Sequence, residues 1–283
     1  MDNIKKSLSD LPPLRDIIRD HDLRAEKKLG QNFLLDLNLT DKIARAAGDL
    51  SDATIFEIGP GPGGLTRSLL ATDIKKLIAI EYDPRAIKAL SGLQSEVCAR
   101  LDIHHLDALQ ADLCAMAEAP RAIVANLPYN IATPLLMNWL QQMKADQTSF
   151  RSMTLMFQKE VAERITAKLG DKNYGRLAII SQWLCDVNLA FDVPASAFTP
   201  PPKVTSSIVY FQPKKLSSDA PSFEAVEKIT AAAFGQRRKM IRSSLKNYTQ
   251  YFEELGLEET LRAENLSVDQ FIALAKTVEN KKL

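Results

Sequence analysis

The sequence predicts an α/β fold with a mainly parallel sheet, followed by a small all-α C-terminal domain. Three observations support this prediction. Short apolar segments alternate with amphipathic ones from residue 54, a glycine-rich turn follows the first apolar segment, and no helix separates the last two predicted strands. Strands that alternate with helical segments indicate βαβ units, in which helices cover both faces of a parallel sheet. We therefore expect seven strands, with an antiparallel pair at the end.

The predicted elements follow in chain order. A helix at 37–47 precedes five strands that alternate with helices, at residues 54–58, 77–81, 101–106, 123–125 and 153–157. The intervening helices run through Leu65 and Leu70, from Pro84, where proline suits a first helical turn, and over 134–143. Helices at 159–169 and 177–183 then precede strands at 187–193 and 204–211. Helices at 223–234, 238–247 and 268–278 are expected to form the C-terminal domain.

The length of 283 residues allows one large α/β domain and a small second one. Residues 1–30 are polar and predict an N-terminal extension, and the polar segment 213–221 is the best linker candidate. We therefore expect an extension at 1–30, a large α/β domain at 31–213 and a small helical domain at 214–283. The sequence contains no internal repeat.

Charge is unevenly distributed although the net charge is only +1. Five cations and no acid lie between Phe234 and Tyr248, and we call them the basic cluster: Arg237, Arg238, Lys239, Arg242 and Lys246. We expect them on neighbouring turns of one helix. Such a cluster favours nucleic-acid phosphates over a merely solvated helix face. Lys203, in a proline-rich loop, is a weaker candidate for the same contact.

The remaining composition predicts a soluble cytoplasmic protein. The three cysteines are widely spaced and form no metal or redox motif, so we expect free thiols in a reducing compartment and no metal ion. No apolar stretch reaches 18 residues, and the N-terminus lacks the apolar segment of a signal peptide, so no membrane contact is expected.

The segment Asn126-Leu127-Pro128-Tyr129 follows the buried strand at 123–125. Pro128 has no N–H for a sheet and disfavours a helical Leu127, so the strand must end in an extended turn. The Asn126 amide oxygen and the carbonyl of Leu127 or Pro128 could accept hydrogen bonds there, with the Tyr129 ring alongside. Two acceptors and a flat ring suit the exocyclic amine of adenine. The alternative is a simple turn with a core tyrosine.

The turn after the first strand contains Gly59, Gly61 and Gly64, which satisfy G-x-G-x-x-G and permit a close backbone approach to a ligand. With Glu81 at the end of the second strand, this pattern alone would also suit an NAD site. Glu57, just before the glycines, would repel a pyrophosphate but could face an ammonium group. Asp107, after the third strand, could accept from an adenine amine. These acids favour S-adenosylmethionine, which carries an ammonium and a sulfonium but no phosphate.

With these motifs in place, the sequence resembles the KsgA-type ribosomal RNA adenine dimethyltransferases. The matching segments are 30–34, 57–66, 126–134, 157–161, 174–177, 198–207 and 234–245. The resemblance implies a Rossmann-like class I methyltransferase sheet in an S-adenosylmethionine-binding domain. It also implies methyl transfer to N6 of two adjacent adenosines in the 3′-terminal hairpin loop of small-subunit rRNA, with the immature small ribosomal subunit as partner. We expect a monomer.

The resemblance also implies roles for individual residues. Asn32 and Leu34 would close over the cofactor, Gly59 would lie against its methionine part, and Asn126 would border methyl donor and target. Glu81 would hold the ribose hydroxyls and Asp107 the adenine amine. We expect Tyr129 to stack on the target adenine after it is flipped from its loop, with Phe198 covering its other face.

Four alternatives remain open. An Erm-type enzyme acting on large-subunit rRNA shares the catalytic logic, as does a DNA adenine methyltransferase. A non-catalytic ribosome-assembly or transcription factor could use the same scaffold, although the intact Asn126 turn argues against it. An NAD-dependent oxidoreductase is the fourth, and the sequence gives it no proton-donor constellation.

Overall fold

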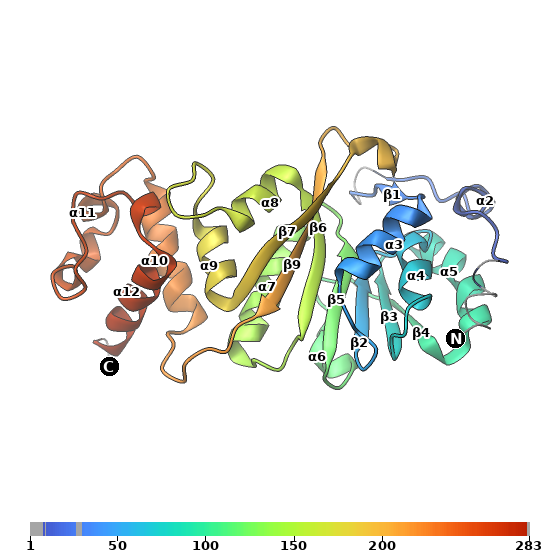
Figure 1. The fold of residues 1–283 in the computed structure, drawn as a ribbon, viewed down its shortest axis with the longest axis horizontal. Coiled ribbons are helices and arrows are strands. Elements are labelled where there is room, and N and C mark those ends of the chain that lie inside the picture. The colour runs from blue at the N-terminus through green and yellow to red at the C-terminus, as the bar shows by residue number, and fades with distance from the viewer. Residues whose placement is uncertain (1–7, 9, 27–29, 282–283) are drawn as a thin grey trace. The chain divides into compact units, whose positions relative to one another are not determined.

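The computed structural model describes residues 8, 10–26 and 30–281; the rest of the predicted N-terminal extension and residues 282–283 lie outside this part. Its main element is a seven-stranded sheet in the order β4-β3-β2-β5-β6-β9-β7 (Figure 1). The strands are β2 (Thr54–Ile58), β3 (Lys76–Glu81), β4 (Leu101–His105), β5 (Arg121–Asn126), β6 (Ser152–Gln158), β7 (Cys185–Val193) and β9 (Ser206–Pro213).

The pairing directions confirm the predicted fold class. Strands β4, β3, β2, β5 and β6 are parallel, whereas β9 runs antiparallel to β6 and lies between it and the edge strand β7. The chain fills the sheet outward from β2 to β4 and then returns to place β5 on the other side of β2. Ligands of open α/β sheets bind where the strand order reverses, outside the carboxyl ends of the strands. This position is the carboxyl end of β2 and β5.

Strands β2, β3, β5 and β6 are almost wholly buried, as expected when helices cover both faces of a sheet, whereas the edge strand β4 ends in two exposed histidines. Ile55, Phe56 and the whole run 122–125 of β5 are at most 1% exposed. Helices α4 and α5 pack against β3, and α5 also packs against β4. The helices up to β7 are α2 (Leu14–Asp20), α3 (Leu37–Ala46), α4 (Gly64–Leu70), α5 (Pro84–Val97), α6 (Leu113–Met116), α7 (Ala132–Ala145), α8 (Lys159–Thr166) and α9 (Arg176–Leu184).

A second, two-stranded sheet was not predicted. Strand β1 (Phe33–Leu34) pairs antiparallel with β8 (Phe198–Thr199), so that Leu34 lies opposite Phe198. Two-residue strands carry no periodicity, and their pairing depends on a contact between distant parts of the chain. This small sheet fixes the segment that the sequence analysis placed over the cofactor.

The prediction of one helix at 238–247 is wrong. A turn at 236–238 and the extended Met240 are followed by the short α11 (Ile241–Ser244) and the 3₁₀-helix η4 (Lys246–Tyr251). Met240 pairs with Arg262 in a β-bridge, and the Ile241 N–H donates to the Leu261 carbonyl (2.7 Å). These pairings with a distant segment require extended backbone at Met240 and end any helix there. The basic cluster therefore does not lie on successive turns of one helix.

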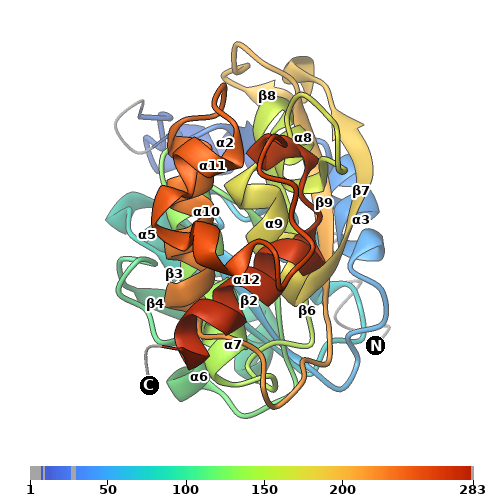
Figure 2. The same cartoon turned by 90° about the vertical axis from the view of Figure 1, so that its left-hand side faces the viewer.

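Contacts divide the chain into two compact units. The first comprises residues 1–139, 148–159 and 189–212, and the second comprises 140–147, 160–188 and 213–283. In the second unit, α9, α10 (Phe223–Gly235) and α12 (Val268–Asn280) pack together (Figure 2). Ser222 and Ser267 cap α10 and α12, and the 3₁₀-helices η2 (Cys98–Arg100), η3 (Ala195–Ala197) and η5 (Ala263–Asn265) complete the described elements. None of the described helices has the length and apolarity needed to span a membrane.

Candidate active site

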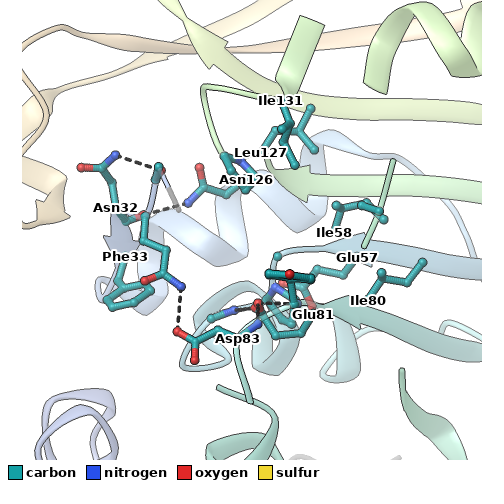
Figure 3. A pocket seen from close by; sticks show the side chains of 18 of the residues that line it. Asn32, Phe33, Glu57, Ile58, Ile80, Glu81, Asp83, Asn126, Leu127 and Ile131 are labelled. Carbon is teal, nitrogen blue, oxygen red and sulfur yellow. Dashed lines mark hydrogen bonds between the residues drawn. The ribbon is translucent and has the colours of Figure 1, made fainter. Parts of the chain in front are cut away.

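A cavity lies at the carboxyl ends of β2, β3 and β5, inside the first unit (Figure 3). It brings together every residue that the sequence analysis assigned to the cofactor or to the target amine. These residues are Asn32, Leu34, Glu57, Gly59, Gly61, Glu81, Asp107, Asn126, Leu127, Pro128 and Tyr129. They come from the ends of β2, β3 and β5, from β1 and from the connecting loops, so the fold rather than local sequence assembles the site.

Asn126 is the last residue of β5, and its side-chain amide is oriented by a hydrogen bond. Its Nδ2 donates to the carbonyl of Asn32 at 3.1 Å, which leaves Oδ1 as the acceptor (Figure 3). In the following turn, the Pro128 carbonyl already accepts from the Ile131 N–H at 3.1 Å. The Leu127 carbonyl is therefore the more available main-chain acceptor beside Asn126.

A hydrogen bond of the Tyr129 hydroxyl holds the Tyr129 ring in place. Tyr129 Oη and Ser206 Oγ lie 2.5 Å apart, and Ser206 is fully buried in β9. Burial raises the pKa of the Tyr129 phenol, and the hydrogen bond with Ser206 partly offsets this rise. The hydroxyl is thus a structural anchor, and the ring is the part of Tyr129 that can meet a ligand.

Glu81 is held rigidly at the end of β3. Its Oε1 accepts from the backbone N–H groups of Tyr82 and Asp83, each at 2.8 Å, and its Oε2 accepts from the Gly61 N–H at 3.1 Å. Burial raises the pKa of Glu81, against the lowering effect of these hydrogen bonds. Because an ionised carboxylate oxygen has about two acceptor sites, Oε2 keeps one for a ligand hydroxyl.

Glu57 differs, because one of its buried oxygens has no partner. The residue is 2% exposed, and Oε2 accepts no hydrogen bond among the described residues. Burial raises the pKa of Glu57 to about 8; the nearby Thr66 hydroxyl opposes this rise, and the charge of Glu81 adds to it. Buried polar atoms are almost always satisfied, so this oxygen indicates a donor that a ligand supplies. An ammonium group beside the glycine turn would satisfy it and favour the ionised form.

Gly64 is required by close packing against the strap, a name we give to residues 30–34. A Cβ built on Gly64 would lie 2.5 Å from the Leu34 carbonyl oxygen. This distance is too short, so the backbone at Leu34 or Gly64 would have to shift. We expect Gly64→Ala to destabilise the fold by about 1–3 kcal/mol and to weaken cofactor binding, because the strap must move. Gly92→Ala in α5 is the matched control. Its Cβ would meet nothing within 4 Å, so a gain of about 0.4–1 kcal/mol is expected from urea unfolding.

Four polar residues of the cavity lining were not predicted from the sequence: Gln31, Tyr82, Asp83 and Asn130. Gln31 Nε2 donates to Asp83 Oδ2 at 3.1 Å, and both residues line the cavity. Hydrogen bonds from the Arg85 guanidinium hold the pKa of Asp83 well below its usual range, at about 2. The spacing of Asp83, two residues after Glu81 at a strand end, was the available signal. The hydrogen bond between Gln31 and Asp83 joins distant parts of the sequence, so no local pattern could have indicated it.

The predicted RNA-contacting residues lie outside this cavity. Phe198 is 3% exposed and packs in the hydrophobic core with Leu34 and Val193, whereas Lys203 is exposed. In the second unit, Arg237 Nε binds Glu264 Oε2 at 3.0 Å, and its Nη2 donates to the Lys172 carbonyl. The other four cations of the basic cluster are exposed, and no described acid pairs with them.

Comparisons with known proteins identify the family of the chain. The family model of the ribosomal RNA adenine dimethylases matches residues 22–280. Proteins named ribosomal RNA small subunit methyltransferase A, from Xanthobacter autotrophicus and Rhodospirillum rubrum, are 53% and 50% identical. The matches cover 96% and 95% of this chain and 95% and 93% of theirs.

Solved structures give the same result. A dimethyladenosine transferase from Plasmodium falciparum superposes with a TM-score of 0.72 at 29% identity, over 88% of this chain and 98% of that one. The 23S rRNA methyltransferase ErmE shares the fold, with a TM-score of 0.67 at 24% identity over 88% and 100% of the two chains. The chain belongs to the ribosomal RNA adenine dimethylase family.

Proposed function

We propose that this protein transfers methyl groups from S-adenosylmethionine to N6 of two adjacent adenosines in the 3′-terminal hairpin loop of small-subunit rRNA. One observation carries the proposal: the Asn126 turn opens into the same cavity as the buried acids Glu57 and Glu81. The small-subunit methyltransferases from Xanthobacter autotrophicus and Rhodospirillum rubrum, which match nearly the whole chain at 53% and 50% identity, support this choice of substrate.

The chain's residues fit this cofactor. S-adenosylmethionine supplies an electrophilic methyl group on a sulfonium centre. The unpartnered Oε2 of Glu57 would accept from the ammonium, and Glu81 Oε2 would accept from a ribose hydroxyl. Asp107 would accept from the adenine amine, and the backbone at Gly59 and Gly61 would allow close approach. Asn32 and Leu34, in the strap, would cover the cofactor.

At the target amine, the chain's residues position the lone pair. Asn126 Oδ1 and the Leu127 carbonyl would accept both N6 hydrogens, which localises the lone pair toward the methyl donor. The anchored Tyr129 ring would stack on the base, a contact worth roughly 1–3 kcal/mol. Asn126 cannot take a proton at neutral pH, so the proton leaves to water after transfer. A monomethylated amine keeps one hydrogen, and the second transfer uses one acceptor.

Phe198 has a different role in this proposal from the one its sequence suggested. Its side chain is buried beside Leu34, and the two residues are paired across β1 and β8. We therefore propose that Phe198 supports the strap, and that it does not cover the target base.

We propose that the basic cluster binds rRNA phosphates through the four cations that pair with no acid in the described part of the chain. We expect the double variant Arg238→Gln/Lys239→Gln to reduce the salt dependence of rRNA binding by up to about two units of slope. Arg237→Gln, which removes a cation already paired with Glu264, is the matched comparison and should change the slope least. Filter binding between low and physiological salt measures both. Equal slopes for the parent and the double variant would remove these residues from the interface.

The decisive experiment is incubation of immature small subunits with labelled S-adenosylmethionine, followed by mapping of the modified nucleosides. Dimethyladenosine in the 3′-terminal hairpin supports the proposal. Label in large-subunit rRNA would support an Erm-type enzyme, label in DNA a DNA adenine methyltransferase, and binding without label an assembly factor. We also propose a cytoplasmic monomer that needs no metal ion. Sedimentation and activity in the presence of a chelator test the oligomeric state and the metal.

A further inference from the structure

We propose that residues 10–26, here called the brace, act through Arg85 to position the strap and so set the affinity for the cofactor. This inference rests on the proposed function, because the strap belongs to the same cavity. The brace itself contributes no residue to the cavity lining, whereas all five residues of the strap line it. The brace can therefore influence the cofactor only through what it holds.

The first connection is apolar. Leu23 is fully buried and forms a core cluster with Phe33, Ala86 and Ala89, against which Ile17 and Ile18 of α2 pack. The Phe33 ring also lies close to the glycine turn, because a Cβ built on Gly61 would lie 3.0 Å from it. Phe33 thus packs with the brace and lies against the cofactor turn. Loss of the brace would uncover it.

The second connection is polar and runs through Arg85. Its Nη2 lies 2.8 Å from Glu26 Oε1, and its guanidinium also reaches the carbonyls of Asp22 (3.4 Å) and Arg24 (3.5 Å). The same guanidinium donates to both carboxylate oxygens of Asp83, from Nε to Oδ1 at 3.0 Å and from Nη2 to Oδ2 at 2.7 Å. Bidentate pairs of this kind fix geometry as well as charge.

Asp83 passes this constraint to the strap. Its Oδ2 accepts from Gln31 Nε2 at 3.1 Å, while Gln31 Oε1 accepts from the Glu26 N–H at 3.1 Å. Gln31 is therefore held from both sides by groups that Arg85 contacts. The far end of the brace is anchored separately, because the buried Arg67 donates from Nη1 to the Pro12 carbonyl at 2.9 Å.

This arrangement makes Arg85 a positioning residue with a specific signature. Arg85 does not line the cavity, so its loss should leave the reaction at saturating cofactor nearly unchanged. It should lower the fraction of molecules whose strap is in place. Apparent affinity falls in proportion to that fraction, so a drop to about one tenth raises the Kd about tenfold.

The test compares Arg85→Gln with Arg100→Gln in the full chain. Arg100 ties the other end of α5 by donating to the carbonyls of Thr72 and Ile74, each at 2.8 Å, far from the strap in sequence. Calorimetry with S-adenosylhomocysteine should give a Kd about tenfold higher for Arg85→Gln and an unchanged Kd for Arg100→Gln. Backbone amides of residues 31–34 should exchange faster with deuterium only in Arg85→Gln. Arg85→Lys keeps the positive charge but cannot form the bidentate pair with Asp83, so its Kd should lie between those of the parent and Arg85→Gln.

The outcomes separate this inference from the proposed function. Equal affinities of the parent and Arg85→Gln, with unchanged exchange in the strap, would overturn the role of the brace and leave the methyltransferase proposal standing. A parent chain that binds no S-adenosylhomocysteine would overturn the proposed function itself. Similar affinity losses in Arg85→Gln and Arg100→Gln would mean general destabilisation and would also count against the brace.

Discussion

Replacing Asn126 by alanine is expected to slow methyl transfer about 100- to 1000-fold, the usual cost of losing one preorganised polar group at a reacting centre. The variant loses the Oδ1 acceptor that orients the N6 lone pair. It also loses the Nδ2 hydrogen bond to the Asn32 carbonyl, so the strap loosens and some cofactor affinity is lost. Single-turnover transfer to small subunits, measured with saturating cofactor, separates the rate from that loss.

The control for this prediction is Asn188→Ala, an exposed asparagine of β7 outside the cavity lining, which should transfer at the parental rate. Calorimetry on Asn126→Ala should show a smaller change in cofactor Kd than in rate. If Asn126→Ala methylates as fast as the parent, another group orients the amine and the assignment of the turn is wrong. If the rate and the affinity fall equally, Asn126 serves the strap and not the amine.

The sequence predicted the part of the fold that depends on local pattern. The apolar runs of β2, β3 and β5 are continuous because both faces of a parallel sheet are buried, and each run ends at a polar residue. Glu57, Glu81 and Asn126 could therefore be placed at one edge from the sequence alone. Parallel strands bring their carboxyl ends together, so three strand ends were enough to locate the cavity.

What the sequence could not predict depends on contacts between distant segments. The pairing of Leu34 with Phe198 buries an aromatic ring that we expected to cover the target adenine. The bridge between Met240 and Arg262 breaks a stretch whose composition favours a helix. The link from Arg85 through Asp83 to Gln31 spans more than 50 residues and has no local signature. In each case tertiary contact overrode local preference.

Glu57→Gln is the second substitution with a large expected effect, and its sign follows from the raised pKa. In the folded chain without cofactor, Glu57 keeps its proton up to a pKa of about 8, against an ordinary value of 4.5. Between these values the folded state binds a proton that the unfolded state has released. The contribution of Glu57 to the free energy of unfolding is therefore complete below pH 4.5 and is lost as pH rises through 8. It falls by at most about 1.4 kcal/mol per pH unit.

Glutamine resembles the protonated acid and does not titrate. Urea unfolding of the cofactor-free protein between pH 5 and 8 should give a stability that falls more steeply for the parent than for Glu57→Gln, by about 1 kcal/mol per pH unit. Groups that do not interact with Glu57 titrate alike in both proteins and cancel in the difference, whereas the coupling of Glu57 to Glu81 belongs to the measured effect. Equal slopes would mean that Glu57 is already ionised in the folded chain.

Cofactor binding should reverse this preference, because an ammonium beside Oε2 stabilises the carboxylate. At pH 7 the parent should release a proton as it binds S-adenosylhomocysteine, which calorimetry in buffers of different ionisation enthalpy detects directly. Glu57→Gln should release none from this site and should bind about 10- to 100-fold more weakly, the range for losing a charged hydrogen bond. Proton release that persists in Glu57→Gln would place the ammonium against a different acid. A different donor would then have to bind the unpartnered Oε2 of Glu57.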